Sequence, residues 1–137
     1  MSKIFRLDFK VRDYECDMQG IVNNAVYQNY LEHTRHEYLL SRGGDFAELT
    51  DQGLNLVVTR AELDYKHPLT SGDHFYITLT AKMKDRVRLV FEQNIFRNDD
   101  TLCVKALMTI TGVYQRGRPG IPKDLVDKLL STSAEKT

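Results

Sequence analysis

The stretch YECDMQGIVNNAVY, residues 14–27, links two segments of different periodicity. In residues 4–12, which precede it, apolar and charged side chains alternate, and this period of two predicts a half-buried strand. Residues 24–42, at its other end, contain no glycine or proline and stop before the pair at 43–44, which predicts a helix with a glycine stop. The quoted stretch is therefore a polar, glycine-containing connection that leads into a helix.

The predicted helix has a cap and one apolar side. Asn23 or Asn24 can cap its first turn, because a side-chain oxygen there can accept a hydrogen bond from a free backbone N–H. Side chains that recur at helical spacing form one side, which is expected to face a sheet: Tyr27, Tyr30, Leu31, Thr34 and Tyr38.

Two further half-buried strands are predicted in residues 57–66 and 75–83, where apolar and polar positions alternate. The first stops before Pro68, and residues 70–73 have the composition of a turn. A hairpin of these two strands is the economical prediction.

The last two predicted strands, residues 87–97 and 102–115, carry apolar side chains on both faces, including Val90 and Leu107. Strands of this kind are central in a sheet or pack against another subunit, so we expect a homo-oligomer. Pro122 can begin a short C-terminal helix with an apolar stripe.

The order of elements predicts the fold class. One strand, one long helix and four more antiparallel strands indicate an α+β domain, in which the helix lies on one face of a sheet of about five strands. Several superfamilies share this outline, so topology alone does not give a function.

Length, charge and composition limit the alternatives. The 137 residues fit one domain, expected to span residues 1–137. The 19 basic residues balance the 19 acidic ones, which gives no reason to expect nucleic acid or an anionic membrane as a partner. No stretch approaches the ~20 apolar residues of a membrane span, and no signal peptide is apparent, so we expect a cytoplasmic location. Cys16 and Cys103 are then expected to be free thiols.

A motif in the opening stretch carries a resemblance. Asp17, Gly20, Val22, Asn24 and Tyr27 match the pattern D-x-x-G-x-V-x-N-x-x-Y. This pattern resembles the signature of the 4-hydroxybenzoyl-CoA thioesterase and related acyl-CoA thioesterases. The resemblance implies the hotdog fold, thioester hydrolysis, and a dimer as the minimum unit, often a tetramer.

The chemistry of a thioesterase gives three motif residues a role. Hydrolysis needs a group that activates water or attacks the carbonyl, and donors aimed at the developing oxyanion. Asp17 is the candidate base or nucleophile. By resemblance, the backbone N–H of Asn24, at the positive end of the helix, is the donor. Gly20 permits a tight backbone path between them.

These residues also have simpler interpretations. An aspartate before a helix is often only a turn residue, the Asn24 side chain is more safely a cap, and Tyr27 fits core packing. Ile21 and Asn24 stand where many relatives have histidine or tyrosine, so the motif places no imidazole beside Asp17. Cys16 is a weaker nucleophile candidate, because nothing in the sequence positions a histidine to activate it.

The histidines do not predict a metal site. His33 and His36 are three residues apart on the predicted helix, but no cysteine or H-E-x-x-H pattern joins them. His67 and His74 flank a turn and are expected at the surface. No metal and no redox cofactor is implied.

A basic cluster lies around the connection between residues 83 and 88. Charged runs of this kind are most often a solvated edge. Because coenzyme A carries phosphates, and the resemblance implies a basic stretch for the nucleotide, Arg86 and Arg88 are also candidates for phosphate binding.

These observations favour hydrolysis of an acyl-CoA, or an acyl group on acyl carrier protein, to a free acid and a thiol. The acyl pocket is expected between the helix stripe, including Tyr27, and the strand residues Val57, Val58 and Thr59, at a subunit interface. The alternative is a non-catalytic hotdog module that binds an acyl ligand. A hydratase of this fold is less favoured, because no histidine accompanies Asp17.

Overall fold

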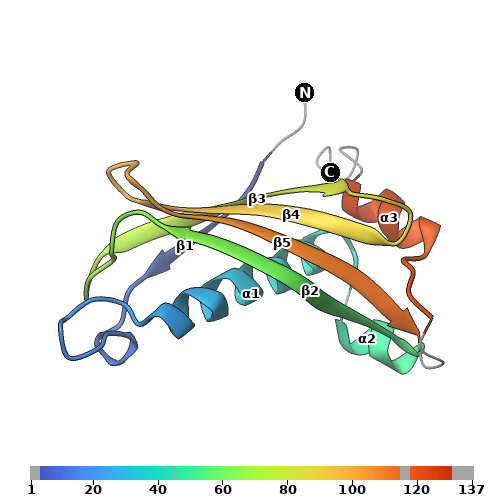
Figure 1. Cartoon of the computed structure of the whole chain (residues 1–137), viewed down its shortest axis with the longest axis horizontal. Coiled ribbons are helices and arrows are strands. Elements are labelled where there is room, and N and C mark those ends of the chain that lie inside the picture. The colour runs from blue at the N-terminus through green and yellow to red at the C-terminus, as the bar shows by residue number, and fades with distance from the viewer. Residues whose placement is uncertain (1–3, 45, 115–117, 131–137) are drawn as a thin grey trace.

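The computed structural model describes residues 4–44, 46–114 and 118–130, which form a five-stranded antiparallel sheet with a long helix on one face (Figure 1). The elements in chain order are β1 (Phe5–Lys10), a 3₁₀ turn (Asp13–Glu15), α1 (Asn24–Ser41), α2 (Phe46–Asp51), β2 (Leu54–Tyr65), β3 (His74–Met83), β4 (Arg88–Arg97), β5 (Leu102–Tyr114) and α3 (Lys123–Leu130). The predicted long helix, sheet and short C-terminal helix are confirmed.

The strand order is β1-β3-β4-β5-β2, with every neighbouring pair antiparallel. The two strands with apolar residues on both faces, β4 and β5, are central, as the sequence indicated. Their register aligns Leu89 with Ile110, which in turn pairs with Val58 of β2.

The helix α1 packs its predicted stripe on the sheet. Asn23 is the cap, since its Oδ1 accepts a hydrogen bond from the Ala25 backbone N–H at 2.9 Å. All five stripe residues are buried, and so are Leu39 and a charged residue, Arg35. The core therefore lies between α1 and the inner face of the sheet.

The predicted hairpin of residues 57–66 and 75–83 is wrong. β2 pairs with β5 at one edge of the sheet, whereas β3 lies between β1 and β4. The connection crosses between these places, and Leu69 in its middle is fully buried. The turn at residues 70–73 does form, with the Asp73 N–H donating to the Thr70 carbonyl. It leads to the side of β1 because Leu69 is held near the start of α1.

The prediction that residues 57–66 are half-buried is also wrong for the single chain. β2 is an edge strand, and Val57 and Val58 are 38% and 43% exposed. Its register shifts between Val58 and Arg60, so Thr59 is a bulge residue. The alternation inferred from the sequence therefore breaks at this position, where the strand changes phase.

The C-terminal segment packs closely against β5. Gly112 lies so close to the backbone that an added Cβ would be 2.2 Å from the carbonyl oxygen of Gly120. The Tyr38 hydroxyl donates to the Leu129 carbonyl, which ties α3 to α1. The 3₁₀ turn and α2 were not predicted, because such short elements have little periodicity. No helix in the described ranges is long and apolar enough to cross a membrane.

Candidate active site

Asp17 begins a tight turn that the backbone defines. The Asp17 N–H donates to the Ile21 carbonyl at 2.9 Å, and the Gly20 N–H donates to the Asp17 carbonyl at 3.0 Å. Gly20 has a φ of 81°, a left-handed conformation that favours glycine. The Asp17 side chain is exposed, and its Oδ1 accepts a hydrogen bond from the Gln19 N–H at 2.9 Å. The turn therefore presents an accessible carboxylate on a fixed backbone.

This turn is anchored to the segment around Leu69. The Val22 N–H donates to the Leu69 carbonyl at 2.9 Å, and the Asn23 N–H donates to the Glu15 carbonyl at 3.1 Å. The Leu69 N–H donates in turn to the Tyr27 hydroxyl at 3.0 Å. The loop that carries Asp17 is thus held against the first turns of α1.

The N-terminus of α1 lies at the same end of the molecule. Asn24 is its exposed first residue, and the first N–H groups of a helix have no partner within it. These groups carry the positive end of the helix dipole. Asp17 and Gly20 thus lie in the turn that leads into this end of α1, and their role together with Asn24 stays a prediction.

Tyr27 belongs to the packing of this end. It is 3% exposed, and its ring contacts those of Tyr30 and Tyr65. Burial raises the pKa of the Tyr27 hydroxyl, so it stays neutral. This position braces the Leu69 segment, in agreement with the packing interpretation.

A cavity of about 320 Å³ lies between the second half of α1 and the sheet. Its lining consists of Glu32, Arg35, His36, Leu39, Leu56, Val57, Val58, Leu89, Phe91 and Ile110. Val57 and Val58 border it, whereas Tyr27 is not among its lining residues. Thr59 is not among the lining residues, and its hydroxyl donates to the Thr109 carbonyl at 3.3 Å in the bulge.

Arg35 is the lining residue that the sequence interpretation missed. Its position four residues after Leu31 places it on the buried stripe, so helical spacing could have identified it. A charged residue at an apolar stripe position was the available signal.

The phosphate candidates lie at the cavity end of the sheet. Val57, Thr111 and Arg88 pair in one row across β2, β5 and β4, so the outer two are about 10 Å apart. The turn with Asp17 is anchored near the start of β3. The connection between β3 and β4, which carries Arg86, follows the end of β3, and a strand of ten residues spans about 30 Å. Asp17 and the arginines are therefore not together within one chain.

Arg86 and Arg88 differ in their partners. Arg88 forms an ion pair with Asp85 at 2.8 Å. Asp85 also accepts hydrogen bonds from the backbone N–H groups of Val87 and Arg88, which together with the ion pair lower its pKa. Arg86 is exposed, and in the described part of the chain no carboxylate pairs with it. Of the two, Arg86 has the more available charge.

The alternative nucleophile has an unfavourable environment. Burial raises the pKa of the Cys16 thiol, and the carboxylates of Asp13 and Asp17 raise it further. The thiol therefore stays protonated near neutral pH. Cys16 and Cys103 are both free, as expected.

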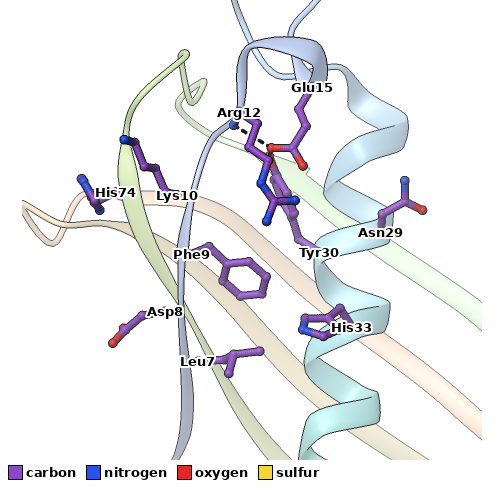
Figure 2. Close-up of a pocket in the computed structure, with 10 residues that line it drawn as sticks. All are labelled: Leu7, Asp8, Phe9, Lys10, Arg12, Glu15, Asn29, Tyr30, His33 and His74. Atoms are coloured by element: carbon purple, nitrogen blue, oxygen red, sulfur yellow. Dashed lines mark hydrogen bonds between the residues drawn. The ribbon is translucent and has the colours of Figure 1, made fainter.

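Two of the four histidines lie on α1, beyond its first turn. His33 and His36 are exposed on α1, and no group of three potential metal ligands occurs among the described residues. His33 and His74 border an open surface groove of about 830 Å³ between β1 and α1 (Figure 2). At one end of this groove Glu15 accepts hydrogen bonds from the Arg12 N–H and the Tyr30 hydroxyl.

Comparison with known proteins identifies the class. The model of the thioesterase-like superfamily matches residues 11–129, and the chain belongs to this superfamily. The chain is similar to the chloroplast acyl-acyl carrier protein thioesterase ATL3 of Arabidopsis thaliana, with 39% identity over 97 residues. That match covers 71% of this chain and 51% of ATL3. The chain thus spans about half the length of this relative.

Solved structures share the fold. The crystal structure of a hypothetical protein from Aquifex aeolicus has a TM-score of 0.85 and 32% identity, covering 91% of this chain and 98% of that one. A 1,4-dihydroxy-2-naphthoyl-CoA thioesterase from Synechocystis has a TM-score of 0.86 at 17% identity, covering 93% and 96%. The fold of this chain is the hotdog fold, as the motif implied.

Proposed function

We propose that this chain is a thioesterase that hydrolyses the acyl thioester of coenzyme A or of acyl carrier protein. The observation that carries the proposal is the fixed turn that holds an exposed Asp17 carboxylate beside the N-terminus of α1. Membership of the thioesterase-like superfamily and the similarity to an acyl carrier protein thioesterase support it.

In the proposed reaction, the thioester carbonyl lies at the N-terminus of α1. The Asn24 N–H donates a hydrogen bond to the carbonyl oxygen and stabilises the negative charge that develops there. Asp17 either takes a proton from the attacking water or attacks the carbonyl to form an anhydride that water then cleaves. Either route breaks the C–S bond and consumes one water, giving a carboxylic acid and a thiol.

We propose that the complete site needs two copies of the chain. Within one chain Asp17 lies at the Tyr65 end of β2, while the cavity lies at the Val58 end. β2 is an unpaired edge with exposed valines, which favours pairing with a second copy. Antiparallel pairing of two β2 strands about their middle would bring Asp17 of one copy to the cavity of the other.

The same pairing would bring the basic connection of β3 and β4 near the Asp17 turn of the second copy. Arg86, with no paired carboxylate in the described ranges, would then bind the phosphates of coenzyme A. Substrates on acyl carrier protein carry a phosphopantetheine arm and would use the same cation.

A panel of acyl-CoAs and acyl carrier protein thioesters, followed with a thiol reagent, tests the activity. Thiol release well above the buffer rate is expected for at least one acyl group. If thiol is released only at the buffer rate for every substrate, the proposed thioesterase activity is wrong, and the non-catalytic module that binds an acyl ligand is favoured. Single turnover in heavy-oxygen water separates the two routes, since label in Asp17 requires the anhydride.

A further inference from the structure

The cavity contains a buried guanidinium that the proposed hydrolysis does not use. Arg35 is only 8% exposed and lines the cavity together with Leu56, Leu89 and Phe91. Burial lowers the pKa of the Arg35 guanidinium, an effect that Glu32 partly offsets. A charged group held among apolar side chains normally has a carboxylate partner, because its desolvation is unfavourable.

No carboxylate forms an ion pair with Arg35 within the residues that the structure describes. Among the described residues, its guanidinium makes one hydrogen bond, from Nη1 to Oε1 of Gln93 at 3.0 Å. Gln93 is itself fully buried and fixed, since its Nε2 donates to the Leu31 carbonyl at 3.0 Å. A guanidinium has five N–H donors, so most of its capacity is left over.

The remaining donors reach the cavity. Among the described residues, Asn94 Oδ1 is the side-chain atom that is both fully buried and without a hydrogen-bond partner. No nitrogen of Arg35 is in this state. The unused nitrogens therefore retain accessible surface, and the cavity is the space that Arg35 borders. Val57 and Val58 form the exposed apolar part of its rim, and an acyl group that enters past them would meet Arg35 with its distal part.

We propose that Arg35 determines substrate specificity by donating hydrogen bonds to an oxygen on the distal part of the acyl group. That the ligand is an acyl group rests on the proposed function. That it carries an oxygen rests on the cavity alone. The pocket then favours acyl groups with a hydroxyl or carboxylate oxygen over hydrocarbon chains of equal length. A hydrocarbon chain would leave the donors unsatisfied, which is unfavourable in a buried site. The volume of about 320 Å³ is at the lower end for ligand pockets and suits a compact acyl group.

Binding of free acids tests this without any need for hydrolysis. Dissociation constants are measured for octanoate, ω-hydroxyoctanoate and octanedioate, and for their shorter and longer homologues, with wild-type protein and Arg35→Met. At the chain length that reaches Arg35, the wild-type protein should bind the ω-hydroxy or dioic acid about tenfold more tightly than the unsubstituted acid of equal length. The hydroxy and dioic acids show which oxygen is preferred. Arg35→Met should remove the difference, and Arg35→Lys should keep part of it.

Controls separate specificity from bracing. Arg6→Met makes the same replacement on β1, at the opposite edge of the sheet, and should leave every dissociation constant unchanged. If Arg35 only holds Gln93, Arg35→Met will lower the thermal midpoint and affect all acids alike, which overturns the proposal. Equal wild-type affinities at every length overturn it as well.

The same pairs as acyl-CoA esters distinguish the two proposals. If both esters are hydrolysed with equal kcat/KM, and Arg35→Met does not change the ratio, the proposed role of Arg35 is wrong and the proposed thioesterase activity stands. Selective binding of the oxygenated acids without hydrolysis of any ester removes the thioesterase and leaves the role of Arg35.

Discussion

The two ends of α1 differ in what they offer a substrate. At the N-terminal end, backbone hydrogen bonds fix a turn with an exposed carboxylate, Asp17, close in sequence to the Asn24 N–H at the start of the helix. In the second half, about 16 Å further along the helix from Asn24, a cavity holds the buried Arg35. In the proposed function, the first end supplies the groups for bond cleavage and the second supplies the groups for recognition. The two ends of one chain would then belong to two different sites, each completed by a second copy.

The largest effect is expected from Asp17→Asn, which keeps the size of the side chain and removes its charge. A positioned base contributes about 10²- to 10⁴-fold, so kcat should fall by at least that range with little change in thermal midpoint. Asp8→Asn, at an exposed ion pair on β1, is the control and should retain full activity. If Asp17 only braces its turn, stability should drop by about 1 kcal/mol while turnover stays normal.

Mixed oligomers test whether one active site is shared between two copies of the chain. Asp17→Asn and a cavity-filling Val58→Trp should each be inactive alone. If Asp17 of one copy serves the cavity of the other, refolding an equal mixture should restore about a quarter of wild-type activity, because half of the dimers regain one intact site. A mixture that stays inactive although mixed dimers have formed would mean that each chain carries its own complete site.

A smaller effect is expected from Val57→Lys on the β2 edge. A lysine without a partner in the paired interface should raise the dissociation constant of the homo-oligomer about tenfold or more. Sedimentation should then show more of the 15.9 kDa monomer at micromolar concentration. Ile4→Lys changes an exposed apolar residue near the other edge of the sheet and should leave assembly unchanged. Equal behaviour of the two variants would contradict pairing through β2.

The smallest effect is expected at the two arginines of the proposed phosphate site. Arg86→Ala should raise KM for acyl-CoA about threefold, and Arg88→Ala less, because Asp85 already opposes the Arg88 charge. Neither change should alter KM for an acyl thioester that lacks the nucleotide. Equal losses with both substrates would remove these residues from phosphate binding.

Regular periodicity made the individual helices and strands predictable. The alternation of residues 4–12 and the buried stripe of α1 are repeated patterns, and each predicted its element within a few residues. Strand pairing was not predictable, because it depends on Leu69 being buried at the start of α1. The bulge at Thr59 is a single residue without a sequence mark, so the phase of β2 was misjudged.

The candidate site divided in the same way. The spacing of Asp17, Gly20 and Asn24 predicted their proximity, because all three lie in one continuous segment. The position of Asp17 relative to Val58 depends on which strands form the edges of the sheet. No local sequence pattern predicts this. Arg35 was overlooked because a lysine or arginine on a helix is normally solvated, although its helical spacing from Leu31 places it on the buried stripe.

The contact between Gly112 and Gly120 has a consequence for sequence variation. No residue larger than glycine fits at position 112 without moving the C-terminal segment, because the oxygen opposite it is backbone and cannot rotate away. Gly20, by comparison, has open space around it, and larger residues there meet only a conformational penalty. In a library of single substitutions selected for folded protein, position 112 should therefore be depleted of every alternative, alanine included. Position 20 should tolerate asparagine, the side chain that most readily adopts its backbone conformation.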